Sequence, residues 1–101
     1  MNKRNQYKIR AKILLYPGME SWRFLALPKK QAADITIRFG GKKRGWGSLP
    51  VGVTIGATYW ETSIFPDKRS GTYLLPLKAA VRKKEGIGHG DVITATLEIK
   101  A

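Results

Sequence analysis

The chain is 101 residues long, 43% hydrophobic and 26% charged, with a net charge of +12, which predicts one folded, strongly basic domain and excludes a disordered chain. It contains no cysteine, so disulfides, thiolate–metal sites and a cysteine nucleophile are excluded, and we expect a cytoplasmic protein. The apolar run at residues 13–16 is too short for a signal peptide, and no stretch is long enough to span a bilayer, so we expect no membrane partner.

The chain opens with a predicted hairpin. Residues 1–6 are polar, and we expect them to be flexible. Residues 7–15 alternate between apolar and mostly basic side chains, which predicts a half-buried strand with a basic outer face. A turn at residues 16–18 and a second strand at residues 22–27 complete an antiparallel hairpin.

Residues 29–39 fit two interpretations. The last five residues of this segment alternate as a strand does, whereas the whole segment has a helical apolar face. Pro28 suits the start of a helix, and the two glycines at residues 40–41 suit its end. We choose the helix, because the second half of the chain repeats this part of the first.

The second half predicts the same kinds of element. Residues 51–55 and 57–65 form consecutive strands, and a further strand ends at Leu75. Pro76 then opens a helix that Gly86 ends. After a glycine-rich turn, residues 92–99 alternate with period two and predict a strand. The apolar set on its buried face is Ile93, Ala95, Leu97 and Ile99.

The two halves repeat each other in order. Leu27-Pro28 lies 48 residues before Leu75-Pro76, and Gly40 lies 48 residues before Gly88. An internal duplication is the simplest explanation of this spacing. Two ββαβ halves, residues 7–56 and 57–100, then form a single domain over residues 7–100. We predict a mainly β fold, a six-stranded barrel capped by two short helices.

Three blocks of sequence together resemble the domain-of-unknown-function family 1905. They are residues 44–51 (RGWGSLPV), residues 60–67 (WETSIFPD) and residues 75–82 (LPLKAAVR), the last followed by Gly90-Asp91. The resemblance covers nearly the whole chain. It implies a double-split β-barrel, the fold class of the AbrB/MazE/MraZ-like transcription factors and antitoxins. It implies no established activity and no site residues, and DNA binding rests on analogy of fold alone.

The positive charge gathers in the first half of the chain. Residues 1–56 carry twelve Lys and Arg against two acidic residues, a net charge of +10, whereas residues 57–101 carry a net charge of only +2. Such an asymmetry is typical of a surface that faces a polyanion, since Lys and Arg neutralise phosphates. A solvated surface that only keeps the protein soluble has the same composition, so both interpretations stay open.

The glycine-rich loop at residues 40–48 is the strongest candidate site. It carries three adjacent cations and one tryptophan, which suit phosphate contacts and stacking on a base. The structural alternative is a surface connection whose tryptophan packs on the barrel. The candidate nucleic-acid ligands are the cations and aromatic residue of this loop and the cations of the first strand, namely Lys42, Lys43, Arg44, Trp46, Lys8, Arg10 and Lys12.

Catalytic chemistry has little support in the sequence. His89 lies two residues from Asp91, but no nucleophile accompanies this pair, and we expect Asp91 to brace its own turn. The seven carboxylates are scattered, so we expect no metal and no cofactor. We expect a binding module rather than an enzyme, with nucleic acid as the partner. The alternatives are an accessory domain that binds another protein and, third, an enzyme for an acidic small molecule.

Overall fold

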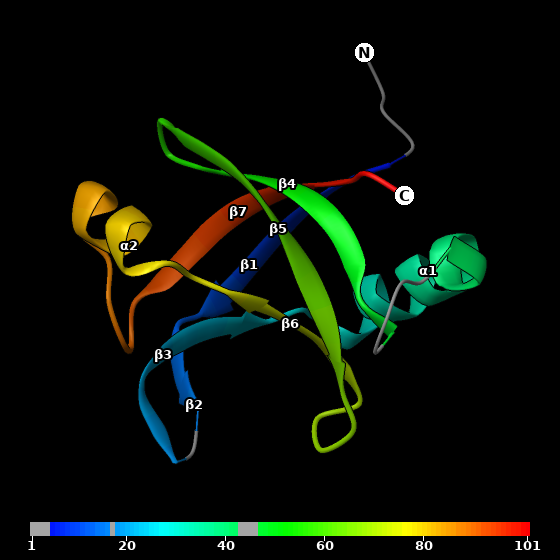
Figure 1. The fold of residues 1–101 in the computed structure, drawn as a ribbon, viewed down its shortest axis with the longest axis horizontal. Helices are drawn as coiled ribbons and strands as arrows, with labels where there is room; N and C mark the ends of the chain where they lie inside the picture. Colours follow the sequence, from blue (N-terminus) through cyan, green and yellow to red (C-terminus); the bar gives the residue numbers. More distant parts are fainter. Residues whose placement is uncertain (1–4, 17, 43–46) are drawn as a thin grey trace.

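The computed structural model describes residues 5–16, 18–42 and 47–101 of the chain. In this part of the chain, strands dominate and two helices accompany them (Figure 1). The strands are β1 (Gln6–Lys12), β2 (Leu14–Tyr16), β3 (Met19–Ala26), β4 (Leu49–Ile55), β5 (Thr58–Asp67), β6 (Thr72–Pro76) and β7 (Val92–Ile99). The helices are α1 (Lys29–Phe39), α2 (Ala79–Glu85) and the short 3-10 turn η1 (Gly40–Lys42).

The strands form a nearly closed, antiparallel barrel in the order β1-β7-β4-β5-β6-β3-β2. The two outermost strands of this order, β1 and β2, are consecutive in the chain, so the turn between them brings the two edges of the sheet together. The mainly β fold predicted from the sequence is confirmed. The described residues contain seven strands where the sequence predicted six.

The additional strand arises from a corner at Ile13. The backbone N–H of Ile13 donates to the carbonyl of Asp91 at 2.8 Å, and its own carbonyl accepts from the N–H of Gly90 at 2.9 Å. The Ile13 side chain is fully buried. The run predicted as one strand over residues 7–15 therefore splits into β1 and β2, because Ile13 bonds to the turn before β7 and redirects the chain.

This corner also changes the pairing of the first strand. Only β2 forms the predicted hairpin with β3, whereas β1 pairs with β7 along its whole length. Asn5 and Gln6 were predicted to be flexible, but both take part in this pairing. Asn5 is hydrogen-bonded to the backbone of Ile99, and Gln6 lies opposite Glu98. Leu15 was predicted to be buried and is 38% exposed, since it follows the corner.

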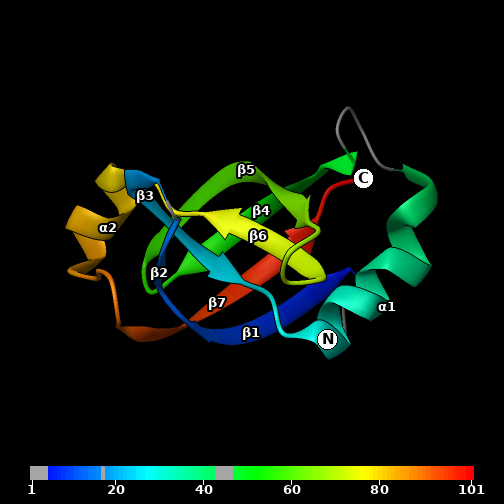
Figure 2. The ribbon, with the colours of Figure 1, turned by 90° about the horizontal axis from the view of Figure 1, so that it is seen from below.

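The two helices lie at opposite ends of the barrel (Figure 2). α1 begins directly after Pro28, and its bounds are those predicted, so the helical interpretation of residues 29–39 is confirmed. α2 ends at Gly86 as predicted, and this residue adopts a left-handed conformation with φ of 65°. The predicted start of α2 was wrong, because Pro76 is the last residue of β6, where it lies opposite Phe24, and the helix begins only at Ala79. Ile35 from α1 and Val81 from α2 are buried, and each packs against the core at its own end of the barrel.

The core fills the barrel interior with the inward side chains of alternating strand positions. The predicted buried face of β7 is confirmed, with Ile93 partly buried and the other three residues buried. Trp60 is also buried, while Trp22 is 46% exposed at the rim. Charged side chains are absent from the core cluster of the described residues, so the cations must be sought on the outside.

Candidate nucleic-acid interface

Three cations line the outer face of β1. Lys8, Arg10 and Lys12 are exposed, because the residues between them point toward the core. Residues two apart in a strand are separated by about 6.7 Å, a distance comparable with the separation of successive phosphates in a nucleic-acid strand. We call these three residues the β1 cation row.

The surroundings of the β1 cation row leave its charge uncompensated. Its neighbours on β7 include Thr94 opposite Arg10 and Thr96 opposite Lys8, both uncharged. None of the three cations forms an ion pair with a residue that the structure describes. Glu98, the acidic residue of β7, lies opposite Gln6, outside the row. It forms an ion pair with Lys100 at 3.3 Å and not with the β1 cation row.

Helix α1 holds β1 in place through a cluster around Tyr7. The Tyr7 hydroxyl donates to Asp34 Oδ2 at 2.6 Å and accepts from Arg38 Nη1 at 2.8 Å. Arg38 also pairs with Asp34 at 3.3 Å. Burial, followed by the bond to Asp34, raises the pKa of Tyr7 to about 12, and the bond from Tyr7 is the main cause that lowers the pKa of Asp34. Asp34 is thereby engaged with its own cluster rather than with the β1 cation row.

The first turn of α1 extends the positive surface. Gln31 Nε2 donates to the backbone carbonyl of Lys8 at 2.8 Å, which fixes the start of the helix beside the β1 cation row. Lys29 and Lys30, the residues before it, are exposed and form no ion pair within the described residues. These two lysines were not among the residues predicted to bind, although a Pro-Lys-Lys helix start next to a basic strand was a usable signal.

The predicted loop site falls largely outside the described residues. Lys42 ends η1, but its side chain is not among those described, and Lys43, Arg44 and Trp46 lie outside the described part altogether. The assignment of these four residues therefore stays a prediction from sequence. Of the seven candidate residues, the structure brings together the three on β1.

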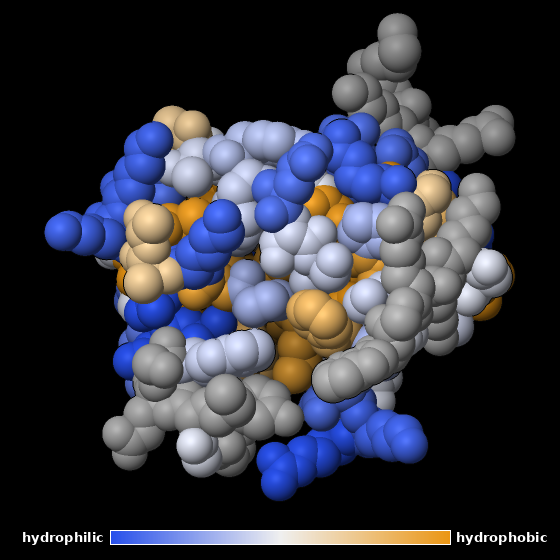
Figure 3. All heavy atoms as spheres, viewed as in Figure 1, coloured by the Kyte–Doolittle hydropathy of each residue, from blue (hydrophilic) through white to orange (hydrophobic). Residues whose placement is uncertain are grey.

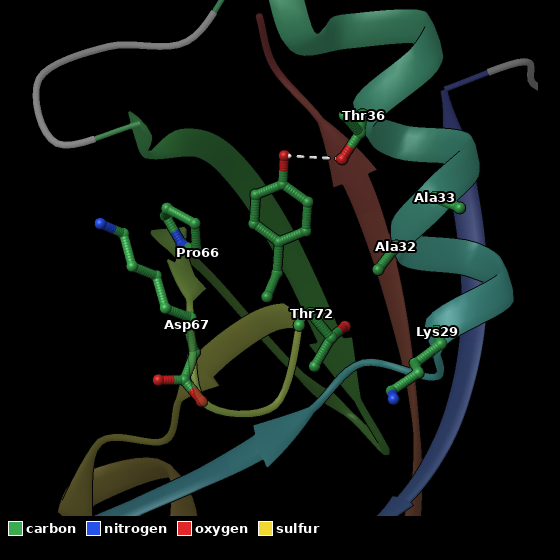
Figure 4. A pocket seen from close by; sticks show the side chains of 10 residues that line it. Lys29, Ala32, Ala33, Thr36, Pro66, Asp67 and Thr72 are labelled. Atoms are coloured by element: carbon green, nitrogen blue, oxygen red, sulfur yellow. Dashed lines mark hydrogen bonds between the residues drawn. The ribbon is translucent and has the colours of Figure 1, made fainter.

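A hollow of about 210 Å³ lies between α1 and the turn that joins β5 to β6. Figure 4 shows Lys29 and Thr36 of α1 on one side of it, with Pro66 and Asp67 on the other. Several of its polar groups are already engaged: the Tyr73 hydroxyl bonds to Thr36 at 3.2 Å, and Asp67 accepts from Ser70 within its own turn. Since pockets for organic ligands usually occupy about 300–1,000 Å³, we treat this hollow as surface relief.

The turn before β7 has the structural role predicted for it. Asp91 Oδ2 accepts from the backbone N–H of Gly88 at 2.8 Å, as expected for a residue that braces its own turn. His89, between them, is exposed. Among the residues described, His, Asp and Glu side chains form no group of three or more that could hold a metal ion. No described helix has the length and apolar character needed to cross a bilayer.

The chain matches a known protein family. A family model described as Domain of unknown function (DUF1905) matches residues 10–97, from within β1 to within β7. No curated protein matches the chain. Because the description of the family names no activity, a function must be inferred from the surface of this chain.

Proposed function

The chain belongs to the family described as Domain of unknown function (DUF1905), and we propose that this member binds nucleic acid through the β1 cation row. The single observation that supports the proposal is the exposure of Lys8, Arg10 and Lys12 along one strand, without an acidic partner in the described residues. Cations held in register on a rigid strand meet a repeating phosphate backbone at little cost in conformational entropy.

The distribution of charge favours a polyanion over a small anion. The β1 cation row is an open strand face, and the exposed Lys30 at the start of α1 lies beside it, in a hollow shared with Tyr7 and Gln31. An extended track of charge engages several phosphates at once, each of which releases counterions on binding. The uncharged threonines of β7 beside the row supply hydroxyl donors for the same backbone.

We also propose that the barrel is a double-split barrel made of two ββαβ halves. The observed pairing supports this, because exchanging the halves leaves it unchanged. β1 pairs with the last strand of the second half, β7, just as β5 pairs with the last strand of the first half, β4. The two remaining strand pairings between the described parts of the halves, β3 with β6 and β4 with β7, join equivalent strands.

The proposed function is tested with two triple variants of equal net charge. Replacing Lys8, Arg10 and Lys12 with Ala removes the β1 cation row, whereas the control replaces three exposed lysines of the α2 region, Lys78, Lys83 and Lys84. Fluorescence anisotropy at low salt measures binding of labelled single-stranded and double-stranded 20-nucleotide probes. We expect the β1 variant to bind at least about tenfold more weakly than the control.

Equal affinities of the two variants would mean that net charge alone attracts the probe, and would refute the assignment to β1. A third variant tests the loop predicted from sequence, with Lys42, Lys43 and Arg44 replaced by Ala. If the loop continues the same surface, this variant also binds more weakly than the α2 control.

A further inference from the structure

An apolar stripe runs over the outer face of β2, β3, β6 and β5. The strand registers place Leu14, Phe24 and Pro76 in one row across the sheet, and Ala26, Leu74 and Phe65 in the next. Leu25 and Leu75, which alternate with these residues, are fully buried, so the stripe faces outward, although Phe24 is covered by its surroundings and only 8% exposed. Figure 3 shows hydrophobic side chains, in orange, gathered over β5 and β6. The described helices cap the ends of the barrel and leave this face uncovered (Figure 2).

The stripe is the outer surface of a sheet and not a defect of the core. Phe65 is 39% exposed, and Trp22, which continues β3 beyond Phe24, is 46% exposed. A hollow of about 340 Å³ lies at one end of the stripe, lined by Leu14, Phe24, Leu74 and further residues. Contiguous apolar surface of this kind marks interaction sites in folded proteins.

Positively charged side chains lie at both ends of the stripe in the direction of β6. Arg69 lines the hollow at the end near the β5–β6 turn, and Lys78 lines a second hollow at the other end, next to Pro76. Neither forms an ion pair with a described residue. The acidic residue at the first end, Asp67, is held by the N–H and hydroxyl of Ser70. The stripe therefore combines an apolar centre with positive ends.

The length of β6, which lies between these two cations, determines how long a partner segment bound along the stripe would be. β6 contains five residues and runs between Arg69 and Lys78, a length of about 17 Å at the usual rise per residue. An extended peptide segment of about five residues covers the same length. A second copy of this chain is disfavoured as the occupant, because two bodies of net charge +12 repel each other.

We propose that the apolar stripe binds an extended segment of another protein, with apolar side chains in its centre and acidic residues at both ends. The apolar side chains cover the two rows over β3 and β6, and the acidic residues meet Arg69 and Lys78. This surface is separate from the β1 cation row, so a nucleic acid and a protein segment occupy different faces of the barrel.

The probe is a fluorescent nine-residue peptide with two glutamates at each end and alternating leucine and threonine in the centre. One control peptide replaces the leucines with serine, and another replaces the glutamates with lysine. We expect the first peptide to bind at least about tenfold more tightly than either control, because apolar and charged contacts are both required. NMR titration should shift the amide signals of β3 and β6.

Protein variants locate the site. Leu74→Glu and Phe65→Glu each place a carboxylate in the apolar stripe and should abolish binding, while Thr94→Glu, on the exposed face of β7, is the matched control and should preserve it. Thermal unfolding verifies that each variant folds. Phe65 is exposed, so its variant tests the site even if Leu74→Glu fails to fold. Removal of the β1 cation row should leave peptide binding intact whatever its effect on nucleic-acid binding.

Three results of the binding experiments would overturn the proposal. They are equal binding of the serine peptide, which would indicate charge attraction alone; amide shifts confined to β1; and no detectable binding at millimolar peptide. Sedimentation at the same protein concentrations should give a monomer. A dimer that Phe65→Glu dissociates would make a second copy the occupant of the stripe and would equally contradict the proposal.

Discussion

Tyr7 links the strand that carries the cations to the helix that lies beside it. Its hydroxyl makes two hydrogen bonds, to Asp34 and from Arg38, and the Arg38 guanidinium also stacks 5.7 Å from the centre of the Tyr7 ring. Because the ring belongs to β1 and both partners belong to α1, this cluster holds the middle and the last turn of α1 against the strand that carries the β1 cation row. A buried hydroxyl with charged partners contributes to stability, since its removal leaves those partners incompletely bonded.

Tyr7→Phe tests this cluster. We expect it to lower the free energy of unfolding by about 1–2 kcal/mol at neutral pH, because Asp34 and Arg38 each lose a bonding partner. Urea denaturation followed by circular dichroism measures the change. Tyr59→Phe is the matched control, since Tyr59 is 52% exposed on β5 and its hydroxyl donates to the exposed Glu61 at 3.2 Å. A loss no larger than that of the control would show that the cluster is unimportant for stability.

The raised pKa of Tyr7 predicts that the protein loses stability at alkaline pH. The pKa of Tyr7 rises from 10.0 to about 12 on folding, so the folded state holds this proton more tightly than the unfolded state. The resulting stabilisation is complete below pH 10 and is lost as the pH rises from 10 through about 12. We expect the stability difference between the wild type and Tyr7→Phe to shrink over this window. A difference independent of pH between 9 and 12 would contradict the linkage.

At the scale of elements, helix α2 ends at a residue that must adopt a left-handed conformation. Gly86 has φ of 65°, and its N–H bonds back into the last turn of the helix. A β-carbon added at Gly86 would meet no other atom within 4 Å, so the strain of a substitution there comes from the backbone alone. Gly88 offers the same open space without a positive φ.

These two glycines form a matched pair. Gly86→Ala should destabilise the protein by about 1 kcal/mol, since an L-residue is disfavoured in the left-handed region. Gly88→Ala should be neutral or slightly stabilising, because alanine reduces the freedom of the unfolded chain. Thermal unfolding of both variants measures the difference, and equal melting temperatures would contradict this account of the helix end.

Local signals predicted the helices better than the strand boundaries. The bounds of α1 were predictable because Pro28 and the glycines at residues 40–41 act within one turn of the helix, and the end of α2 followed from Gly86 in the same way. The corner at Ile13 was not predictable, because the alternation of residues 7–15 continues through it. Its cause is a pair of hydrogen bonds to residues 90 and 91, almost eighty positions away.

At the scale of the whole molecule, Ile13 joins the two edges of the barrel. Its backbone bonds to the turn before β7, and its side chain belongs to the core. We expect Ile13→Ala to lower the free energy of unfolding by about 3 kcal/mol, the usual cost of a cavity at a buried isoleucine. Ile37→Ala on α1 is the matched control, since Ile37 is 83% exposed, and should change stability by less than about 0.5 kcal/mol. Equal effects in chemical denaturation would show that the corner is not part of the cooperative core.

The candidate site was predictable in part for similar reasons. Alternation placed Lys8, Arg10 and Lys12 on one face, and the structure puts them there. The contribution of Lys30 required the position of α1 against β1, which depends on Gln31 and Tyr7. The apolar stripe was not predictable, since its two rows combine residues from four strands whose pairing only the fold determines.

The salt dependence of nucleic-acid binding tests the central claim most directly. The logarithm of the association constant for a 20-nucleotide probe should fall linearly with the logarithm of salt concentration. Replacing Lys8, Arg10 and Lys12 with Ala should reduce that slope by about two to three, one phosphate contact for each cation, while the α2 control variant keeps the slope of the wild type. No binding by the wild type at low salt, or the same slope for all three proteins, would contradict the claim that the β1 cation row binds nucleic acid.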